Sequence, residues 1–468
     1  MKIDKTIKVA DLAKPVERVL ELAARKVRAI DRHWDSSQGA PVFTVEGKYT
    51  TRGWTEWTQG FQYGCAILAF DGTDDRKLLN LGRKRTVDHM ATHVTHTGVH
   101  DHGFNNLSTY GNLRRLMRER RIPSNEWEMN FYEMAIKASG AVQASRWSEW
   151  DTNIEDLVMA DDYIAPPAYV YSFNGPHSLF VDTMRTLRIL CVAHRLGHVV
   201  MGENDEQDSL LRRAIAHAET TANYIVFKGG DEQTYDVYGR TAHEAIFNTN
   251  DGSFRCRSTQ QGYSPFSTWT RGLAWAMLGF AEQIEFIKSC SAAEIRDGSG
   301  CEKSDVLNAF TEIACATCDH YVNDCTAHDG VPYWDDGAPG LAEMADWRDR
   351  ESQPFNDHEP VDSSAAAIAA QGLIRLGHSL GKSKGKRYLQ AGLSVVRTIF
   401  EEPYLSTKRD HQGLLLHSVY HRPNGWDHIP KDRRIPCGES SMWGDYHAIE
   451  LAILIQRMAR GKYMTFFD

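Results

Sequence analysis

Two aspartates stand where a carboxyl group could carry out acid–base chemistry. Asp182 lies in SLFVDTMRTLRIL, among the apolar residues of a segment with helical periodicity. Burying a carboxylate is costly unless it is paired or functional, and burial raises the pKa of the group. Such a carboxyl suits a general acid at neutral pH, so we expect Asp182 to be one. Asp101 ends a run of histidines and either joins this chemistry or caps the helix that follows it.

The histidine run reads HMATHVTHTGVHDHGF over residues 89–104 and holds five of the chain's 20 histidines. His89, His93 and His96 could share one helix face, and histidines at i and i+4 can bind zinc. However, the run contains no HExxH motif and no Cys or Glu at ligand spacing. We therefore expect no metal here, but polar packing between helices, with His100 hydrogen-bonded beside Asp101 in a cleft.

Further polar and aromatic residues gather where helices are expected to begin. They are Trp57; Gln261, Trp269 and Arg271; Asp362, Ser363 and Ser364; and Glu439, Trp443 and Asp445. Arg271 lies in a mostly apolar helix and needs an anionic partner, either a protein carboxylate or a substrate carboxylate. Asp362 could instead be a helix N-cap, and a Trp at a helix start could simply belong to the core.

The elements that must position these residues are almost all helical. Apolar residues recur at i, i+3, i+4 and i+7 in about twelve segments, whereas alternating strand patterns are short and few. These segments lie near 11–33, 55–70, 74–94, 104–120, 125–146, 178–198, 205–228, 264–288, 303–322, 361–381, 384–402 and 439–460. No Pro/Ser-rich or charged linker divides the chain, so we expect one catalytic domain over 1–468, with residues 1–10 a short N-terminal extension.

Every second helix is apolar nearly all round, as in STWTRGLAWAMLGF and SSAAAIAAQGLI, which predicts burial on both sides. The intervening helices have a charged face. Six buried helices alternating with six half-exposed ones predict an all-α, (α/α)6 barrel of two concentric rings. The alternative, an open α-solenoid, would need a regular repeat length that the uneven spacing lacks. In the barrel all inner helices run the same way, so the candidate residues at their starts would meet at one mouth.

Net charge and composition limit the kinds of partner that the protein is expected to bind. The net charge is −9 and the isoelectric point about 6.1, which gives no pull toward nucleic acid or anionic membranes. The 12 Trp, 18 Tyr and 18 Phe either fill the core or stack on sugar rings.

The first residues lack the apolar core of a signal peptide, no apolar run is long enough to span a bilayer, and nine cysteines argue against a disulfide framework. We expect a cytoplasmic protein with reduced thiols. Cys315 and Cys318 lie near three further cysteines, Cys290, Cys301 and Cys325; this group is either a zinc or redox site or a set of small buried apolar residues.

Eight motifs in order resemble the unsaturated glucuronyl hydrolases of glycoside hydrolase family 88. They are WTEWTQGF, VHDHGF, VDTMRTLRIL, QQGYSPFSTWTRGLAW, VPYWDDGAP, VDSSAAAIAAQGL, LLLHSVYHRPNG and SMWGDYHAIEL. The resemblance implies the same (α/α)6 barrel and a substrate with a terminal 4,5-unsaturated uronic acid. It also implies hydration of the C4=C5 vinyl ether, after which a hemiketal breaks down to a keto acid and a shortened sugar. Separately, the sequence has no Gly-rich phosphate loop after a strand and no strong metal spacing, so we expect no cofactor and no metal.

By motif position, the resemblance implies that Asp182 is the general acid and base and that Asp101 holds the sugar hydroxyls. Trp57 would stack on the sugar, and His100 would complete the HD pair. The remaining expected substrate contacts are Gln261, Trp269, Arg271 and Trp443.

The chain also departs from the family. Gln260 replaces a histidine, Thr183 and Arg185 replace apolar or amide residues, and Pro265, Phe266 and Ser267 stand where a basic residue is usual. These changes would bear on recognition of the leaving sugar. Three alternatives stay open: a family 105 type hydrolase of unsaturated rhamnogalacturonides, a hydrolase of saturated glucuronides, and a uronide-binding protein without catalysis. A barrel sugar epimerase is more remote, because such sites use paired histidines.

Overall fold

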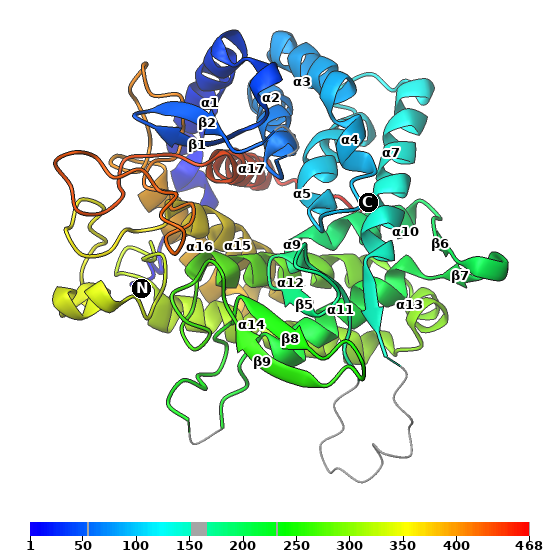
Figure 1. Ribbon diagram of the computed structural model, residues 1–468. Coiled ribbons are helices and arrows are strands. Elements are labelled where there is room, and N and C mark those ends of the chain that lie inside the picture. Colours follow the sequence, from blue (N-terminus) through cyan, green and yellow to red (C-terminus); the bar gives the residue numbers. More distant parts are fainter. Residues whose placement is uncertain (54–55, 151–165, 231–232, 468) are drawn as a thin grey trace.

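Two concentric rings of helices build the protein (Figure 1). The computed structural model describes residues 1–53, 56–150, 166–230 and 233–467. The inner ring consists of α2 (Gln59–Thr73), α5 and α6 (His102–Asn106 and Asn112–Arg118, joined by a π-helical turn at Leu107–Gly111), α9 and α10 (Thr183–Thr186 and Arg188–Arg195), α12 (Thr270–Ser289), α15 (Ser363–Lys384) and α17 (Met442–Ala459).

The outer ring alternates with the inner one along the chain. Its helices are α1 (Ala13–His33), α3 (Arg76–His89), α7 (Glu126–Ser145), α11 (Leu210–Tyr224), α14 (Lys303–His320) and α16 (Lys386–Ile399). Two shorter helices, α4 (Ala91–Val94) and α13 (Ala292–Ser299), follow α3 and α12. Each of the twelve predicted segments therefore contains a helix.

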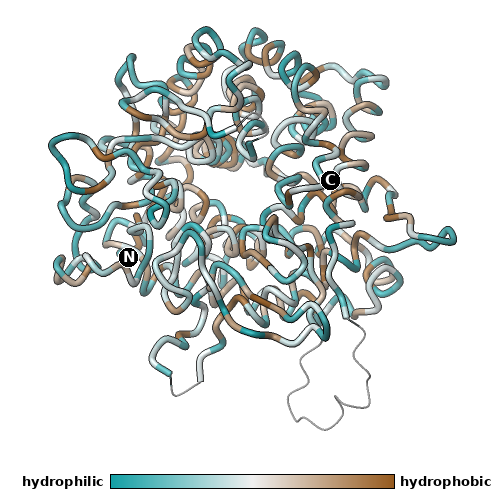
Figure 2. Tube along the Cα trace, in the orientation of Figure 1, coloured by the Kyte–Doolittle hydropathy of each residue, from teal (hydrophilic) through white to brown (hydrophobic). Residues whose placement is uncertain are grey.

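The inner ring closes on itself. Consecutive inner helices pack against one another, and the last, α17, packs against the first, α2. This closure confirms the predicted (α/α)6 barrel and rules out the open solenoid. Brown, hydrophobic residues lie mainly along the ring helices in Figure 2, whereas the outlying loops are largely teal. Among the described residues, no helix combines the length and apolar character needed to cross a membrane.

Glycines set how closely the inner helices approach. A Cβ at Gly60 in α2 would lie 2.3 Å from the carbonyl oxygen of Asn105 in α5, and one at Gly103 would lie 2.3 Å from that of Thr186 in α9. No side chain fits in those gaps, so glycine is required at both contacts. These contacts lock together the three helix starts that carry Trp57, Asp101 and Asp182.

Several inner helices begin later than their sequence patterns predict. The segments predicted to start at 55, 178 and 264 become helical only at Gln59, Thr183 and Thr270; residue 55 itself lies outside the described residues. A short strand, β5 (Ser178–Phe180), occupies the start of one of these segments. Several residues before these helices are buried and apolar, such as Leu179, Phe180 and Val181, and apolar periodicity does not distinguish such a packed segment from a helix.

Short antiparallel strands lead into these helix starts. β5 pairs with β8 (Glu244–Phe247), which pairs with β9 (Phe254–Ser258), and β5 ends two residues before Asp182. The hairpin of β1 (Pro41–Val45) and β2 (Lys48–Thr51) is joined to α17 by a bridge from Phe43 to Ser441. Two further hairpins are β3 (Trp147–Glu149) with β4 (Ala168–Val170), and β6 (Val200–Met201) with β7 (Gln207–Asp208).

A cluster of buried charges lies inside the inner ring, on α9, α10, α12, α15 and α17. Arg185 is fully buried and pairs with Glu450 at 2.6 Å and with Glu282. Arg188 lies between the same two glutamates, and Arg375 pairs with Glu285 at 2.9 Å. We call these six residues the buried charge cluster. Arg185 is thus a core residue, so the expectation that it bears on leaving-sugar recognition is wrong; the same holds for the fully buried Thr183.

Candidate active site

The starts of four inner helices, α2, α5, α9 and α12, contribute to one cavity of about 480 Å³. Its walls contain seven of the eight predicted site residues: Trp57, His100, Asp101, Asp182, Gln261, Trp269 and Arg271. A cavity of this size is in the usual range for a site that encloses a small ligand. The structure therefore brings together residues that are separated by more than 200 positions in sequence.

The two aspartates occupy helix starts without capping them. Asp101 is the residue before α5 and Asp182 the residue before α9, yet neither side chain accepts a capping hydrogen bond. The capping alternative for Asp101 is therefore wrong. Asp362 shows the contrast, because its carboxylate accepts from the backbone N–H groups of Ser364 and Ala365 at the start of α15.

His100 pairs with Asp182. Its Nε2 lies 3.2 Å from Oδ1 of Asp182, and the imidazole is almost fully buried. Burial alone would lower the pKa of His100, but the charges of Asp101 and Asp182 and the hydrogen bond outweigh it and raise that pKa. His100 therefore favours the imidazolium form and forms an ion pair with Asp182.

Protonation of the two carboxyls differs from the prediction. Burial would raise the pKa of Asp182, but the hydrogen bond and charge of His100 outweigh it, and the net shift is downward. The expectation that burial keeps Asp182 protonated in the free protein is therefore wrong. Burial raises the pKa of Asp101 to about 6, with the negative charge of Asp182 acting in the same direction. Asp101 is thus the carboxyl that more readily holds a proton.

Arg271 has its anionic partner inside the protein. Its guanidinium pairs with Asp362 at 3.0 Å, donates to the carbonyl oxygen of Tyr420 at 2.8 Å and donates to Oε1 of Gln261 at 3.0 Å. The ring of Trp269 covers one side, with its centroid 4.7 Å from the guanidinium carbon. Arg271 and Gln261 are therefore held as one rigid unit in the cavity wall.

Trp443 is the predicted site residue that the structure does not place in the cavity. It is fully buried, and its indole N–H donates to the hydroxyl of Ser364 at 3.0 Å. Its ring stacks on that of Trp57 with centroids 5.0 Å apart. The expected contact between Trp443 and substrate is wrong, because Trp57 lies between Trp443 and the cavity.

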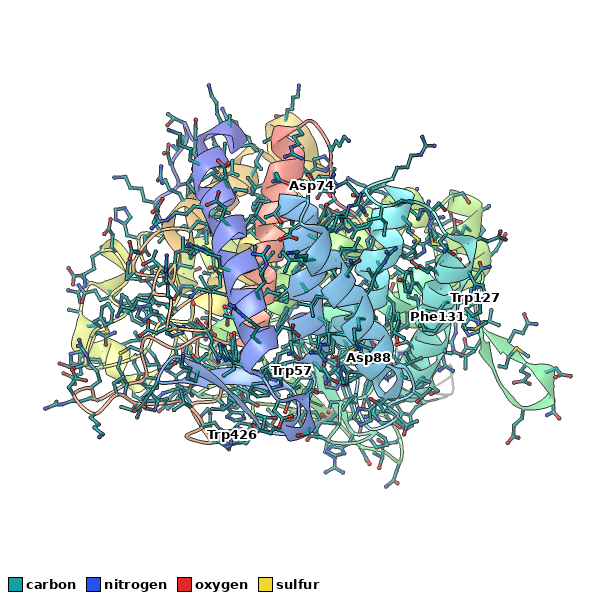
Figure 3. The ribbon with its side chains drawn as sticks, turned by 90° about the horizontal axis from the view of Figure 1, so that it is seen from above. Trp57, Asp74, Asp88, Trp127, Phe131 and Trp426 are labelled. Carbon is teal, nitrogen blue, oxygen red and sulfur yellow. The ribbon has the colours of Figure 1, made fainter. Side chains whose placement is uncertain are left out.

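Two loops contribute cavity residues that the sequence patterns did not single out. Arg52 and Glu56 come from the segment before α2; Tyr420, His421, Asn424 and Trp426 come from the loop between α16 and α17. Trp57 and Trp426 lie toward the same end of the molecule in Figure 3. The second loop could have been found from the sequence by the unusual density of aromatic and polar residues in YHRPNGW, a stretch without periodicity.

Glu56 adds a third carboxyl to the cavity. Burial raises its pKa to about 7, and its Oε1 accepts a hydrogen bond from the backbone N–H of Trp57 at 3.1 Å. Of the departures near Gln261, Gln260 lines the cavity, whereas Pro265, Phe266 and Ser267 do not. Of these residues that differ from the family, Gln260 is therefore the one positioned to affect which ligand binds.

The histidine run packs between helices, as predicted. His93 hydrogen-bonds to the side chain of Gln59 at 2.7 Å, and His102 contacts Ser139 at 2.9 Å and the carbonyl oxygen of His96 at 3.0 Å. Within the described residues, the run forms no group of ligand atoms suited to a metal. All nine cysteines are free, and Cys315 and Cys318 belong to no such group.

Relatives of the chain carry names that fit this site. An unsaturated glucuronyl hydrolase of Bacillus sp. (strain GL1) is 24% identical over 420 residues, which cover 89% of this chain and 90% of the relative. An unsaturated chondroitin disaccharide hydrolase of Streptococcus pyogenes serotype M1 is 24% identical over 449 residues, covering 93% and 90%. These similarities confirm the resemblance that the motifs indicate. No protein-family model matches the chain.

Solved structures support the fold. The crystal structure of the unsaturated glucuronyl hydrolase of Bacillus sp. GL1 superposes with a TM-score of 0.65 at 22% identity, covering 95% of each chain. At this identity the match establishes the fold, and it agrees with the ring closure described above.

Proposed function

We propose that this protein is a glycoside hydrolase that removes a terminal 4,5-unsaturated uronic acid from lyase-generated oligosaccharides by hydrating the C4=C5 bond. One observation carries the proposal: Asp101 and Asp182, two carboxyls that cap no helix, line the same cavity, and His100 hydrogen-bonds to Asp182 there. The names of the relatives, which refer to unsaturated glucuronyl and chondroitin disaccharide substrates, support the same reading.

The proton for C4 comes from the His100–Asp182 pair. The substrate brings a uronate carboxylate into the cavity and displaces water, and both changes disfavour the charged form of Asp182. The proton then moves from Nε2 of His100 to Oδ1 of Asp182 across the 3.2 Å contact. Asp182 passes this proton to C4 of the vinyl ether as a general acid, which leaves an oxocarbenium ion centred on C5.

Water completes the reaction. The Asp182 carboxylate, now without its proton, takes a proton from a water molecule as the oxygen adds to C5. The product is a hemiketal with one added water. It opens to a ketone at C5, which frees the hemiacetal at C1 and releases the shortened sugar. The two carboxyls thus do not act as the nucleophile and acid of a retaining glycosidase.

The other wall residues hold the sugar. Asp101, with its raised pKa, shares a hydrogen bond with the sugar hydroxyls and keeps the ring over Asp182. The Arg271–Gln261 unit provides fixed polar contacts for the uronate ring and carboxylate. Trp57, backed by Trp443, offers a stacking face.

The proposal is tested on a panel of oligosaccharides made by polysaccharide lyases. Loss of the ultraviolet absorbance of the conjugated C4=C5 bond follows the reaction, and mass spectrometry identifies the product. In water enriched with oxygen-18, we expect one label in the keto acid. A wild-type protein that is inert on the whole panel contradicts the proposal. Release of an intact uronic acid from saturated glucuronides would instead identify direct hydrolysis.

We also propose that the reaction takes place in the cytoplasm, on small oligosaccharides. All nine cysteines are free thiols, which suits a reducing compartment. Fractionation of the producing cell, with the enzyme assay as readout, tests the location. Activity confined to the medium would contradict it.

A further inference from the structure

A second cluster of reactive side chains lies outside the cavity, behind the start of α12. It consists of His320 at the end of α14, Cys325 at the end of a π-helical turn (Tyr321–Cys325), and Asp336 in the loop VPYWDDGAP. One potential ligand atom from each residue lies within 4.8 Å of the other two. We call these three residues the His–Cys–Asp cluster. His320 and Cys325 are buried, and the proposed catalytic steps use none of the three.

Two of the three spacings between the ligand atoms match a tetrahedral zinc site, and the third is within 4.8 Å. Oδ2 of Asp336 lies 3.6 Å from Sγ of Cys325 and 3.6 Å from Nε2 of His320. Bond lengths of about 2.3 Å to sulfur and 2.1 Å to nitrogen or oxygen, at tetrahedral angles, separate ligand atoms by about 3.4–3.6 Å. An ion therefore fits among the three atoms with little movement of the side chains.

The surroundings also have the form of a metal site. Nδ1 of His320 has no hydrogen-bond partner although it is buried, and Oδ2 of Asp324 lies only 3.4 Å from it. A histidine that binds a metal through one nitrogen commonly donates from the other to a carboxylate. The hydroxyl of Thr268 hydrogen-bonds to Nε2 of His320 at 3.3 Å, and an ion bound to this nitrogen replaces that hydrogen bond.

One cation already contacts the cluster. Arg240 donates to Oδ2 of Asp336 at 3.2 Å, and its guanidinium is also held by the carbonyl oxygen of Phe266 at 2.6 Å. A carboxylate oxygen has two lone pairs, so it can accept a hydrogen bond from Arg240 and bind a metal ion at the same time. Ligating carboxylates are commonly hydrogen-bonded in this way.

We propose that His320, Cys325 and Asp336 bind a structural zinc ion. The mixed nitrogen, sulfur and oxygen set suits zinc, whereas calcium and magnesium prefer oxygen ligands alone. Binding replaces the thiol proton of Cys325, which is released to solvent. The ion fixes the end of α14 to the loop that carries Asp336. Because Thr268 donates its backbone N–H to Asp336 at 2.7 Å, the ion also steadies the approach to Trp269 and Arg271. This inference is independent of the proposed reaction.

Metal content tests the proposal. Protein is produced in zinc-supplemented medium, purified without chelators or a polyhistidine tag, and analysed by mass spectrometry of the elements. We expect one equivalent of zinc in the wild type. Cys325→Ser and His320→Gln should each lower the occupancy at least about tenfold. Cys318→Ser, a buried cysteine of α14 outside the cluster, is the matched control and should keep the zinc.

A spectroscopic measurement needs no variant. Protein produced in cobalt-supplemented medium should show the near-ultraviolet charge-transfer absorption of a thiolate bound to Co²⁺. A wild type without zinc or that absorption would overturn the proposal, and would leave a thiol that simply hydrogen-bonds to Asp336. Full zinc occupancy in a folded Cys325→Ser variant would overturn it as well.

Discussion

At the scale of single residues, Asp182 decides whether the cavity is catalytic. We expect Asp182→Asn to lower kcat by about 100- to 10,000-fold, because the amide cannot pass a proton to C4 or accept one from water. Substrate affinity should change far less, since the ring contacts come from other residues. Single-turnover kinetics and equilibrium binding separate the two effects. Asp251→Asn, at an exposed turn, is the control, and full activity of Asp182→Asn would refute the assignment.

Asp101 gives a second residue-scale prediction, on stability. Its pKa is raised from 3.8 to about 6 in the folded protein, so between these values the folded state holds a proton that the unfolded state has lost. Stability from this group is therefore greatest below about pH 4 and is lost as the pH rises through about 6. Asp101→Asn should raise the free energy of unfolding near pH 8 by about 1–3 kcal/mol.

The same substitution should bring little or no gain at about pH 3, below both pKa values, where wild-type Asp101 is protonated in both states. Urea unfolding of both proteins at the two pH values measures the difference. An equal effect at both values would contradict the raised pKa. A gain in stability with a loss of activity would be the usual trade-off of a functional carboxyl.

At the scale of elements, the loop between α16 and α17 forms one wall of the cavity through Trp426. Trp426 is 38% exposed and lies under the guanidinium of Arg52, 4.5 Å from its ring centroid. Trp426→Ala should raise KM for oligosaccharides about three- to tenfold through lost stacking, with kcat nearly unchanged.

Trp127→Ala provides the matched control for that loop, because Trp127 is 76% exposed on α7 and does not line the cavity (Figure 3). Equal kinetics for the two variants would show that the loop does not contact the substrate. A fall in kcat alone would place Trp426 closer to the reacting atoms than the structure does.

The same elements show how far sequence reasoning reaches. The twelve helices follow from apolar periodicity, and the residues at their starts meet because alternate helices run in parallel. Apolar periodicity does not show how deep a residue lies in the barrel. The sequence therefore does not distinguish Trp443 from Trp57, although only Trp57 lines the cavity. Trp426 was missed because its loop has no periodicity, and Glu56 was missed because it lies in the segment 55–70 that was predicted to be helical. The protonation of Asp182 depends on the placement of His100, which a lone sequence does not reveal.

At the scale of the whole molecule, the buried charge cluster ties four of the six inner-ring positions together, namely α9 with α10, α12, α15 and α17. Glu450→Gln would leave Arg185 and Arg188 without one of their two glutamate partners in a dry interior. We expect a loss of about 3–5 kcal/mol in the free energy of unfolding. Arg296→Ala, which breaks an exposed pair with Glu302, should change the free energy of unfolding far less. Urea unfolding measures both, and similar small losses would show that water reaches the cluster.

Ring closure also has a consequence for biosynthesis. The stacking face of Trp57, near the beginning of the chain, rests on Trp443 in the last inner helix. A nascent chain still lacking α17 therefore exposes an unsupported indole and an open seam beside α2. The pocket can become competent only after the ribosome has released the final helix, so premature termination within α17 should yield aggregation-prone material instead of a weakened enzyme.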